Sequence, residues 1–106
     1  MSNALPDNAK AALERLIDIA RRDTGQSRKV ANFLLAWWNA EACGGFDLTE
    51  VWGVDTAIAA DMATVFALLT RCQQYSDTLG YRKQFEAIVG AWRPAHQEDE
   101  RQEETL

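Results

Sequence analysis

Four closely spaced carboxylates are the residues of this sequence with the clearest potential for acid–base or metal chemistry. They are Asp47, Glu50, Asp55 and Asp61. Paired carboxylates can bind metal ions or transfer protons. Three of the four, however, fall where helices are expected to begin, and there a carboxylate caps backbone N–H groups. Asp61 falls inside a helix at the margin of its apolar face, where we expect its carboxylate to be hydrated or paired with an arginine such as Arg71 or Arg82. A buried acid in a pocket is the alternative for Asp61 and for Glu41.

The histidine and cysteine residues give no pattern typical of a catalytic or metal site. His96 follows Pro94 in a polar segment and has no fixed partner of the kind that a general base or a zinc ligand needs. Cys43 and Cys72 form no CxxC motif, so we expect two small buried thiols in a reducing compartment, with a disulfide as the alternative. The glycines match no phosphate-binding loop. The sequence predicts no catalytic residue, cofactor or metal, and therefore a non-enzymatic protein.

A basic cluster, RRDTGQSRK, places four cations around one turn. Its cations are Arg21, Arg22, Arg28 and Lys29. The first two suit the C-terminal end of a helix, whereas the last two fall in a first turn, where the helix dipole disfavours cations. The cluster could bind an anion or phosphate. Nucleic-acid binders usually carry excess positive charge, but this chain has a formal net charge of −5, most of it near the C-terminus. We therefore do not expect nucleic acid as the main partner.

The stretch LLAWWNAEACGGFDLTEVWGVD, residues 34–55, holds three of the four tryptophans and no basic residue. Trp37 and Trp38 are adjacent, so they point about 100° apart on a helix. Trp52 follows on a short element, and Glu41 projects within the same arc as the first two indoles. A small bundle has limited room for three indoles, and tryptophan is enriched at interface hot spots. These four residues are candidate interaction residues; the alternative is that the tryptophans fill the core, with Trp52 favoured as core.

Apolar residues recur at helical spacing in four segments, and no segment alternates with a period of two. The expected helices span residues 8–22, 27–42 and 56–74, with a short helical turn after Asp47. The segment YSDTLG is expected to be a loop, in which Asp77 or Thr78 caps a last helix that runs to Trp92. Ser27 is the expected N-cap of the second helix, which is apolar around more than half its circumference and is therefore central. One glycine of the Gly44–Gly45 pair should end it with a positive φ. The fold predicted is all-α, a compact bundle of four helices plus one short connecting helix.

The third helix is expected to have two contrasting faces. The buried face should comprise Ile58, Met62, Val65, Phe66, Leu69 and Cys72. The opposite face is small and uncharged, which would allow a second copy of the chain to approach closely; it comprises Ala59, Ala60, Ala63, Thr64, Ala67 and Thr70. The last helix should bury a narrow stripe comprising Tyr81, Phe85, Ile88, Val89 and Trp92.

The composition predicts one domain, residues 1–94, followed by an acidic and disordered tail, residues 95–106. The N-terminus lacks the features of a signal peptide, and no apolar run approaches the roughly 18 residues of a membrane span. We expect a cytoplasmic protein without membrane contact.

Two stretches of the sequence carry a family resemblance. GQSRKVANFLLAWWNAEACGGFDLTEVWGVDTAIAADM and DTLGYRKQFEAIVGAWRP resemble a family of small proteobacterial proteins of unknown function, often encoded near integrated mobile elements. The resemblance spans about Leu13 to Pro94 and is most specific from WWN to VWGVD. It implies a bacterial, cytoplasmic, accessory protein and assigns no activity, cofactor or site residue.

The function predicted is that of a small interaction module that binds a protein partner or self-associates. The alternative is a regulator of nucleic-acid machinery that uses the basic cluster, Arg21–Lys29, or the acidic tail.

Overall fold

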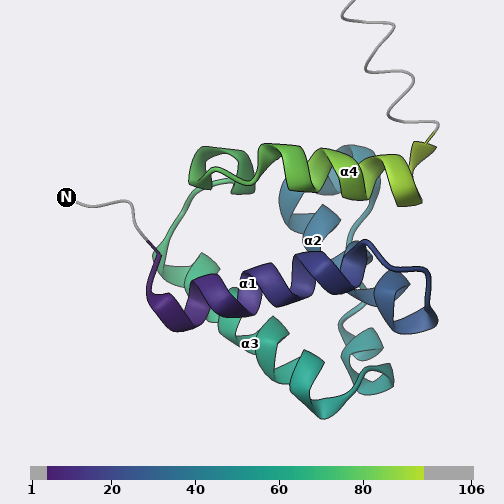
Figure 1. Ribbon diagram of the computed structural model, residues 1–106, viewed down its shortest axis with the longest axis horizontal. Helices are drawn as coiled ribbons and strands as arrows, with labels where there is room; N and C mark the ends of the chain where they lie inside the picture. Colours follow the sequence, from purple (N-terminus) through teal and green to yellow (C-terminus); the bar gives the residue numbers. More distant parts are fainter. Residues whose placement is uncertain (1–4, 95–106) are drawn as a thin grey trace, which may run out of the picture.

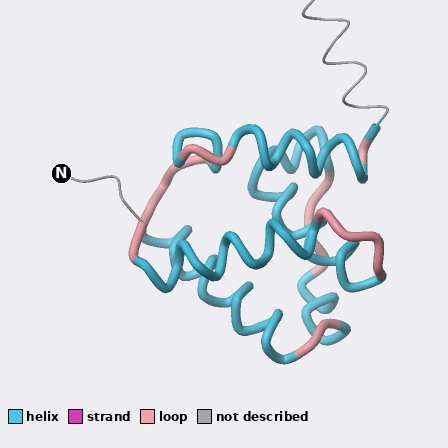
Figure 2. Tube along the Cα trace, in the orientation of Figure 1, coloured by secondary structure: helices cyan, strands magenta, loops and turns pink. Residues whose placement is uncertain are grey.

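The computed structural model describes residues 5–94, which form four α-helices and two short 3₁₀ helices (Figure 1). In chain order these are α1 (Asp7–Ala20), α2 (Gly25–Cys43), η1 (Leu48–Gly53), α3 (Thr56–Arg71), η2 (Ser76–Leu79) and α4 (Arg82–Trp92). Residues 5–94 contain no strand, so the prediction of an all-α fold is confirmed (Figure 2). No helix among them has both the length and the apolar character needed to cross a membrane. The predicted tail and His96 lie outside the described residues.

Helix α2 contacts several elements, as its wide apolar arc predicted, since it packs against α1 and α4 and touches both 3₁₀ helices. It is not the single centre of the bundle, because α1 packs against all three other α-helices. Of the α2 side chains, Val30, Ala31, Leu34 and Leu35 are fully buried. The stripes predicted for the flanking helices are also in the core, where α1 contributes Leu13, Leu16, Ile17 and Ala20, and α4 contributes Phe85, Ile88 and Val89.

Helix α2 begins two residues earlier than predicted. Thr24 is its N-cap, because its extended backbone (φ −130°, ψ 167°) lets its hydroxyl accept the backbone N–H of Ser27 at 3.0 Å. Ser27, the expected cap, is instead fully buried in the first turn, with its hydroxyl 2.7 Å from that of Thr24.

The C-terminal end of α2 is broken at Asn39, which the sequence did not reveal. Asn39 has non-helical dihedral angles (φ −168°, ψ 86°), and its side-chain oxygen accepts the N–H of Ala42 at 3.2 Å, capping the last turn. Gly44 then ends the helix with φ 98°, while Gly45 has no positive φ. The predicted role of the glycine pair is therefore carried by Gly44. Glu41 lies beyond the break and is exposed, not within the apolar arc of the tryptophans.

Helix α3 ends at Arg71 instead of residue 74, and its buried face differs from the predicted one. Met62, Val65 and Leu68 are buried, whereas Phe66 is 58% exposed and Leu69 is only half-buried. The reason is that α3 packs chiefly on a single helix, α1, and turns Asp61 toward it. Arg15 of α1 holds that carboxylate through two hydrogen bonds of 2.8 Å.

The Asp61 contact confirms an arginine partner for this residue, but the partner is Arg15 and not Arg71 or Arg82. The outer side of α3 remains at the surface, with Ala60, Ala63, Phe66 and Thr70 exposed.

The last helix is shorter than predicted. Residues 76–79 form the separate helix η2, and Gly80 follows with φ 93°, so α4 begins only at Arg82. Tyr81 occupies the N-cap position of α4, but no side chain caps the helix there. The segment expected as a loop after α3 therefore contains an ordered turn that returns the chain to α2.

Candidate functional site

Trp52 projects from η1 with 85% of its surface exposed, and Leu48 on the same turn is 75% exposed. The preference for Trp52 as a core residue is therefore wrong. The apolar contacts of this segment with the core come instead from Phe46, Val51 and Val54. Phe46 meets Phe33 of α2 edge to face, with their ring centroids 5.4 Å apart.

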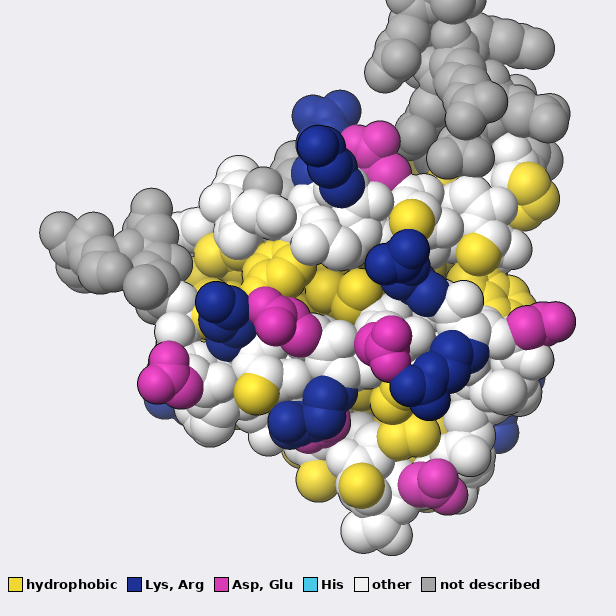
Figure 3. Space-filling view, viewed as in Figure 1, with side chains coloured by type: hydrophobic (Ala, Val, Ile, Leu, Met, Phe, Trp, Pro, Cys, Tyr) yellow, Lys and Arg dark blue, Asp and Glu magenta, His cyan; other side chains and the backbone are white. Residues whose placement is uncertain are grey.

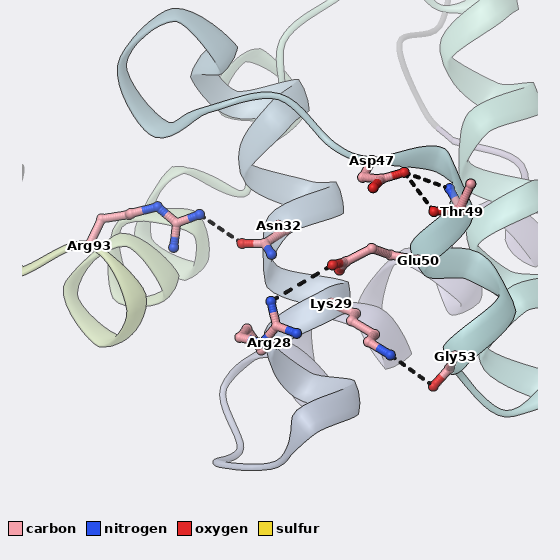
Figure 4. A network of polar contacts seen from close by, with 8 residues as sticks. All are labelled: Arg28, Lys29, Asn32, Asp47, Thr49, Glu50, Gly53 and Arg93. Atoms are coloured by element: carbon pink, nitrogen blue, oxygen red, sulfur yellow. Dashed lines mark hydrogen bonds and ion pairs between the residues drawn. The ribbon is translucent and has the colours of Figure 1, made fainter.

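The chain after Gly44 runs back along α2 and reaches its N-terminal half. Three polar contacts hold η1 and its end there, two of which are drawn in Figure 4. Arg28 pairs with Glu50 at 3.9 Å, and the Lys29 ammonium donates to the Gly53 carbonyl at 3.5 Å. Gln26 accepts the backbone N–H of Asp55 at 2.6 Å through its side-chain oxygen. The turn that carries Trp52 is thus held to α2 at its middle and at its C-terminal end.

The three carboxylates expected to cap helices differ in what they do. Asp47 accepts the backbone N–H and the hydroxyl of Thr49 at 3.0 and 2.8 Å, so it caps η1 as predicted (Figure 4). These two hydrogen bonds hold the pKa of Asp47 below its usual value. Glu50 pairs with Arg28 instead of completing a capping box. Asp55 occupies the N-cap position of α3, but its carboxylate does not cap the helix, because it faces Gln26.

The basic cluster does not form one open cationic surface. Arg22 pairs with Asp18 on its own helix, while Arg28 and Lys29 reach across to η1. Arg21 is exposed and makes no side-chain hydrogen bond or ion pair within residues 5–94. Figure 3 shows the cations interspersed with carboxylates on the face that it displays. The nearby Glu50 carboxylate also offsets the unfavourable interaction of Arg28 with the helix dipole.

Trp37 and Trp38 are half-buried and rest on the same core ring. Phe85 of α4 meets Trp37 edge to face and Trp38 in a stacked arrangement, with centroid distances of 5.7 Å in both cases. The Trp37 indole N–H donates to the backbone carbonyl of Gln74 at 3.0 Å. Both indoles therefore belong partly to the core and partly to the surface, between the two alternatives that the sequence left open.

A hollow of about 560 Å³ opens beside these two indoles. It is lined by Ala36, Trp37, Trp38, Asn39, Ala40, Glu41 and Tyr75. Tyr75, which immediately precedes η2, is 64% exposed. A second hollow of about 320 Å³ shares Trp37 and Tyr75 and extends toward Leu69 and Cys72. The sequence analysis missed Tyr75, since an aromatic residue in a loop has no periodic pattern to mark it.

The two cysteines and Tyr81 are buried or half-buried. Cys43 is buried, Cys72 is half-buried, and no disulfide joins them. Tyr81 donates its hydroxyl to Glu14 at 3.0 Å, and burial followed by this hydrogen bond raises the pKa of Tyr81 to about 12. Among the described residues, no three or more His, Cys, Asp or Glu side chains are grouped to hold a metal ion. Two surface features therefore stand out in the described part of the chain, the exposed Trp52 turn and the aromatic hollow.

The chain belongs to a family of unknown function, DUF7673, whose model matches residues 10–93. The match spans all four α-helices apart from the first turn of α1. No curated protein and no solved structure matches the chain.

Proposed function

We propose that this member of the DUF7673 family is a non-enzymatic binding module that inserts Trp52 into an apolar pocket of a protein partner. The supporting observation is the 85% exposure of an indole on a turn that α2 holds in place. Exposed apolar patches mark interaction sites, and tryptophan is among the residues enriched at binding hot spots. Leu48 on the same turn adds a second exposed apolar side chain.

The attachment of the turn favours tight binding. A flexible loop must lose conformational entropy when it binds, whereas a preorganised one has already lost it. Lys29 and Gln26 contact the C-terminal end of η1, and Arg28 contacts its middle. The indole is thus presented on a fixed backbone.

The charges around the turn define the partner further. Asp47 and Asp55 flank η1, both are exposed, and neither is ion-paired with a Lys or Arg in the described part of the chain. Arg28 and Lys29 reach the same turn, but they are engaged there by Glu50 and by the Gly53 carbonyl. A partner that places an apolar pocket between lysine or arginine side chains would complement this surface. Such charges at a rim mainly raise the association rate and make it dependent on salt.

The test compares Trp52→Ala with Phe66→Ala, which removes an exposed aromatic side chain elsewhere. Proteins captured by the wild type and by Phe66→Ala, but not by Trp52→Ala, are purified, and their affinities are measured by calorimetry. We expect Trp52→Ala to weaken binding about thirtyfold or more, as for a hot spot. Its melting temperature should stay within about 2 °C of the wild type, since the residue is exposed. A large loss of stability, or equal affinity of both variants, would refute the proposal.

A second copy of this chain is the other protein partner to consider, through the outer side of α3. Sedimentation equilibrium tests it directly. A dimer that Ala63→Glu dissociates and Trp52→Ala leaves intact would replace the Trp52 proposal by self-association through α3.

The alternative of a regulator of nucleic-acid machinery has its own test. Binding to nucleic acid through phosphate contacts would weaken steeply as salt increases. Arg21 would then be the sensitive position, because it is exposed and makes no side-chain hydrogen bond or ion pair within residues 5–94. A bacterial cytoplasmic setting near mobile elements remains an expectation from the sequence resemblance, and the identity of the captured partner would test it.

A further inference from the structure

The larger hollow combines aromatic rings with a single charge, and that charge is negative. Trp37, Trp38 and Tyr75 contribute the rings, and Glu41 is the only charged residue in the lining. The smaller hollow beside it has no charged residue in its lining. Aromatic faces attract cations through the ring quadrupole, most strongly for tryptophan, and this attraction is the basis of quaternary ammonium recognition.

The rings are held in place by contacts behind them. Phe85 supports both indoles, and the Trp37 N–H is already bonded to the Gln74 carbonyl. The polar atom of Trp37 is therefore occupied, and its contribution to a ligand would be its ring surface. The Tyr75 side chain is packed less tightly than the two indoles, since most of its surface is exposed.

The break in α2 adds negative potential at the same place. Asn39 departs from helical geometry, and Ala40 and Glu41 follow it along the rim of the hollow. The C-terminal end of a helix carries partial negative charge, which favours a cation there. No Lys or Arg lies between residues 29 and 71 to compete for this position from the same segment.

We propose that this hollow binds a quaternary ammonium group. Its volume of about 560 Å³ falls within the range of small-molecule sites, roughly 300–1,000 Å³, and leaves room for the methyl groups of such a cation. The methyl groups would contact the aromatic rings, while Glu41 would attract the charge. The group can come from a free small molecule or from a trimethylated lysine side chain, since both present the same chemistry.

The test is an NMR titration that follows the indole signals of Trp37 and Trp38. The probe is choline, and the matched neutral compound is 3,3-dimethyl-1-butanol, which has the same shape without the charge. We expect saturable shifts with choline and binding of the neutral compound weaker by about tenfold. Equal binding of the two compounds, or shifts that do not saturate with choline, would overturn the proposal.

Variants then locate the site. Tyr75→Ala and Glu41→Gln, both at exposed positions, should weaken choline binding about fivefold or more. Trp52→Ala and Asp47→Asn are the controls, because neither residue lines the hollow, and they should leave choline affinity unchanged. Equal effects of all four variants would contradict the assignment.

A final comparison identifies the source of the cation. Tighter binding of a short peptide carrying trimethyl-lysine than of choline would indicate a modified protein, and the reverse order would indicate a small molecule. The choline experiments do not depend on the Trp52 proposal. The hollow lies at the C-terminal end of α2, whereas the Trp52 turn contacts its N-terminal half.

Discussion

Ser27 and Ser76 are the two polar residues that are fully buried in the described part of the chain, and they differ in their hydrogen bonds. The Ser27 hydroxyl lies 2.7 Å from that of Thr24, whereas the Ser76 hydroxyl has no partner among residues 5–94. Removing an unsatisfied buried hydroxyl is neutral or stabilising, but removing a satisfied one leaves its partner unpaired.

Ser76→Ala should therefore leave the free energy of unfolding unchanged or raise it, while Ser27→Ala should lower it by about 1 kcal/mol. Urea unfolding of the two variants measures both values. Greater destabilisation by Ser76→Ala than by Ser27→Ala would mean that the Ser76 hydroxyl is bonded in solution.

Tyr81 is expected to make stability depend on alkaline pH. Its pKa is raised to about 12 in the folded protein, against about 10 for an unfolded tyrosine. The folded state therefore retains this proton over a pH range in which the unfolded state releases it, and stability should fall as pH rises from 10 to 12, by on the order of 2 kcal/mol. Denaturant unfolding across this range measures the effect. In the Tyr81→Phe variant, stability should not fall in this way between pH 10 and 12. The same fall of stability in the variant as in the wild type would contradict the assignment to Tyr81.

At the scale of the helix, the orientation of α3 can be tested with two neighbouring leucines. Leu68 is 6% exposed and Leu69 is half-buried. Leu68→Ala should cost about 2–5 kcal/mol, as for a buried leucine, and Leu69→Ala less. Thermal or urea unfolding of the two variants measures these losses of stability. A larger loss for Leu69→Ala than for Leu68→Ala would show that α3 buries the face predicted from the sequence.

The end of α2 offers a similar matched pair in Gly44 and Gly45. A Cβ added to either glycine would have no heavy atom within 4 Å, so neither substitution creates a clash. Only Gly44 has a positive φ, and an alanine there is strained by about 1 kcal/mol or more. Gly44→Ala should therefore lower the melting temperature more than Gly45→Ala. Equal effects would show that the chain does not need this conformation to turn toward η1.

At the scale of the whole molecule, the end of α4 closes the bundle. The Trp92 indole N–H donates to the Ala20 carbonyl at 2.7 Å, at the end of α1. Arg93 donates to the Cys43 carbonyl at 3.1 Å and to Asn32 at 2.7 Å, the latter shown in Figure 4. Two adjacent residues thus join α4 to the ends of both α1 and α2.

A chain that ends at residue 94 should melt within a few degrees of the full-length protein, because the sequence beyond is acidic and poor in apolar residues. A chain that ends at residue 91 loses several hydrogen bonds of about 1 kcal/mol each and the contacts of the Trp92 ring, so it should melt far lower. Calorimetry of the two truncated chains tests this difference. A large effect of the first truncation would show that the acidic segment stabilises the domain.

The amino-acid sequence by itself determined the helices that have a clear amphipathic period. The stripes of α1 and α4 are buried as predicted, and the wide apolar arc of α2 correctly indicated contacts with more than one neighbouring helix. These properties are local, since side chains three and four residues apart share one face of any α-helix. The positive φ within the Gly44–Gly45 pair was predictable for the same reason, because a helix end imposes its own backbone conformation.

Only the tertiary structure decided the features that matter for binding. The rotation of α3 depends on Arg15 and Asp61, 46 residues apart, and the exposure of Trp52 depends on contacts from α2 that span 24 and 29 residues. The aromatic hollow requires the break at Asn39 and the return of Tyr75 from beyond α3. A periodic pattern states which residues share a face, but it does not state which neighbour covers that face. The covering neighbour depends on packing between segments that are distant in the chain. For this reason Trp52, which was predicted to lie in the core, is exposed to the solvent.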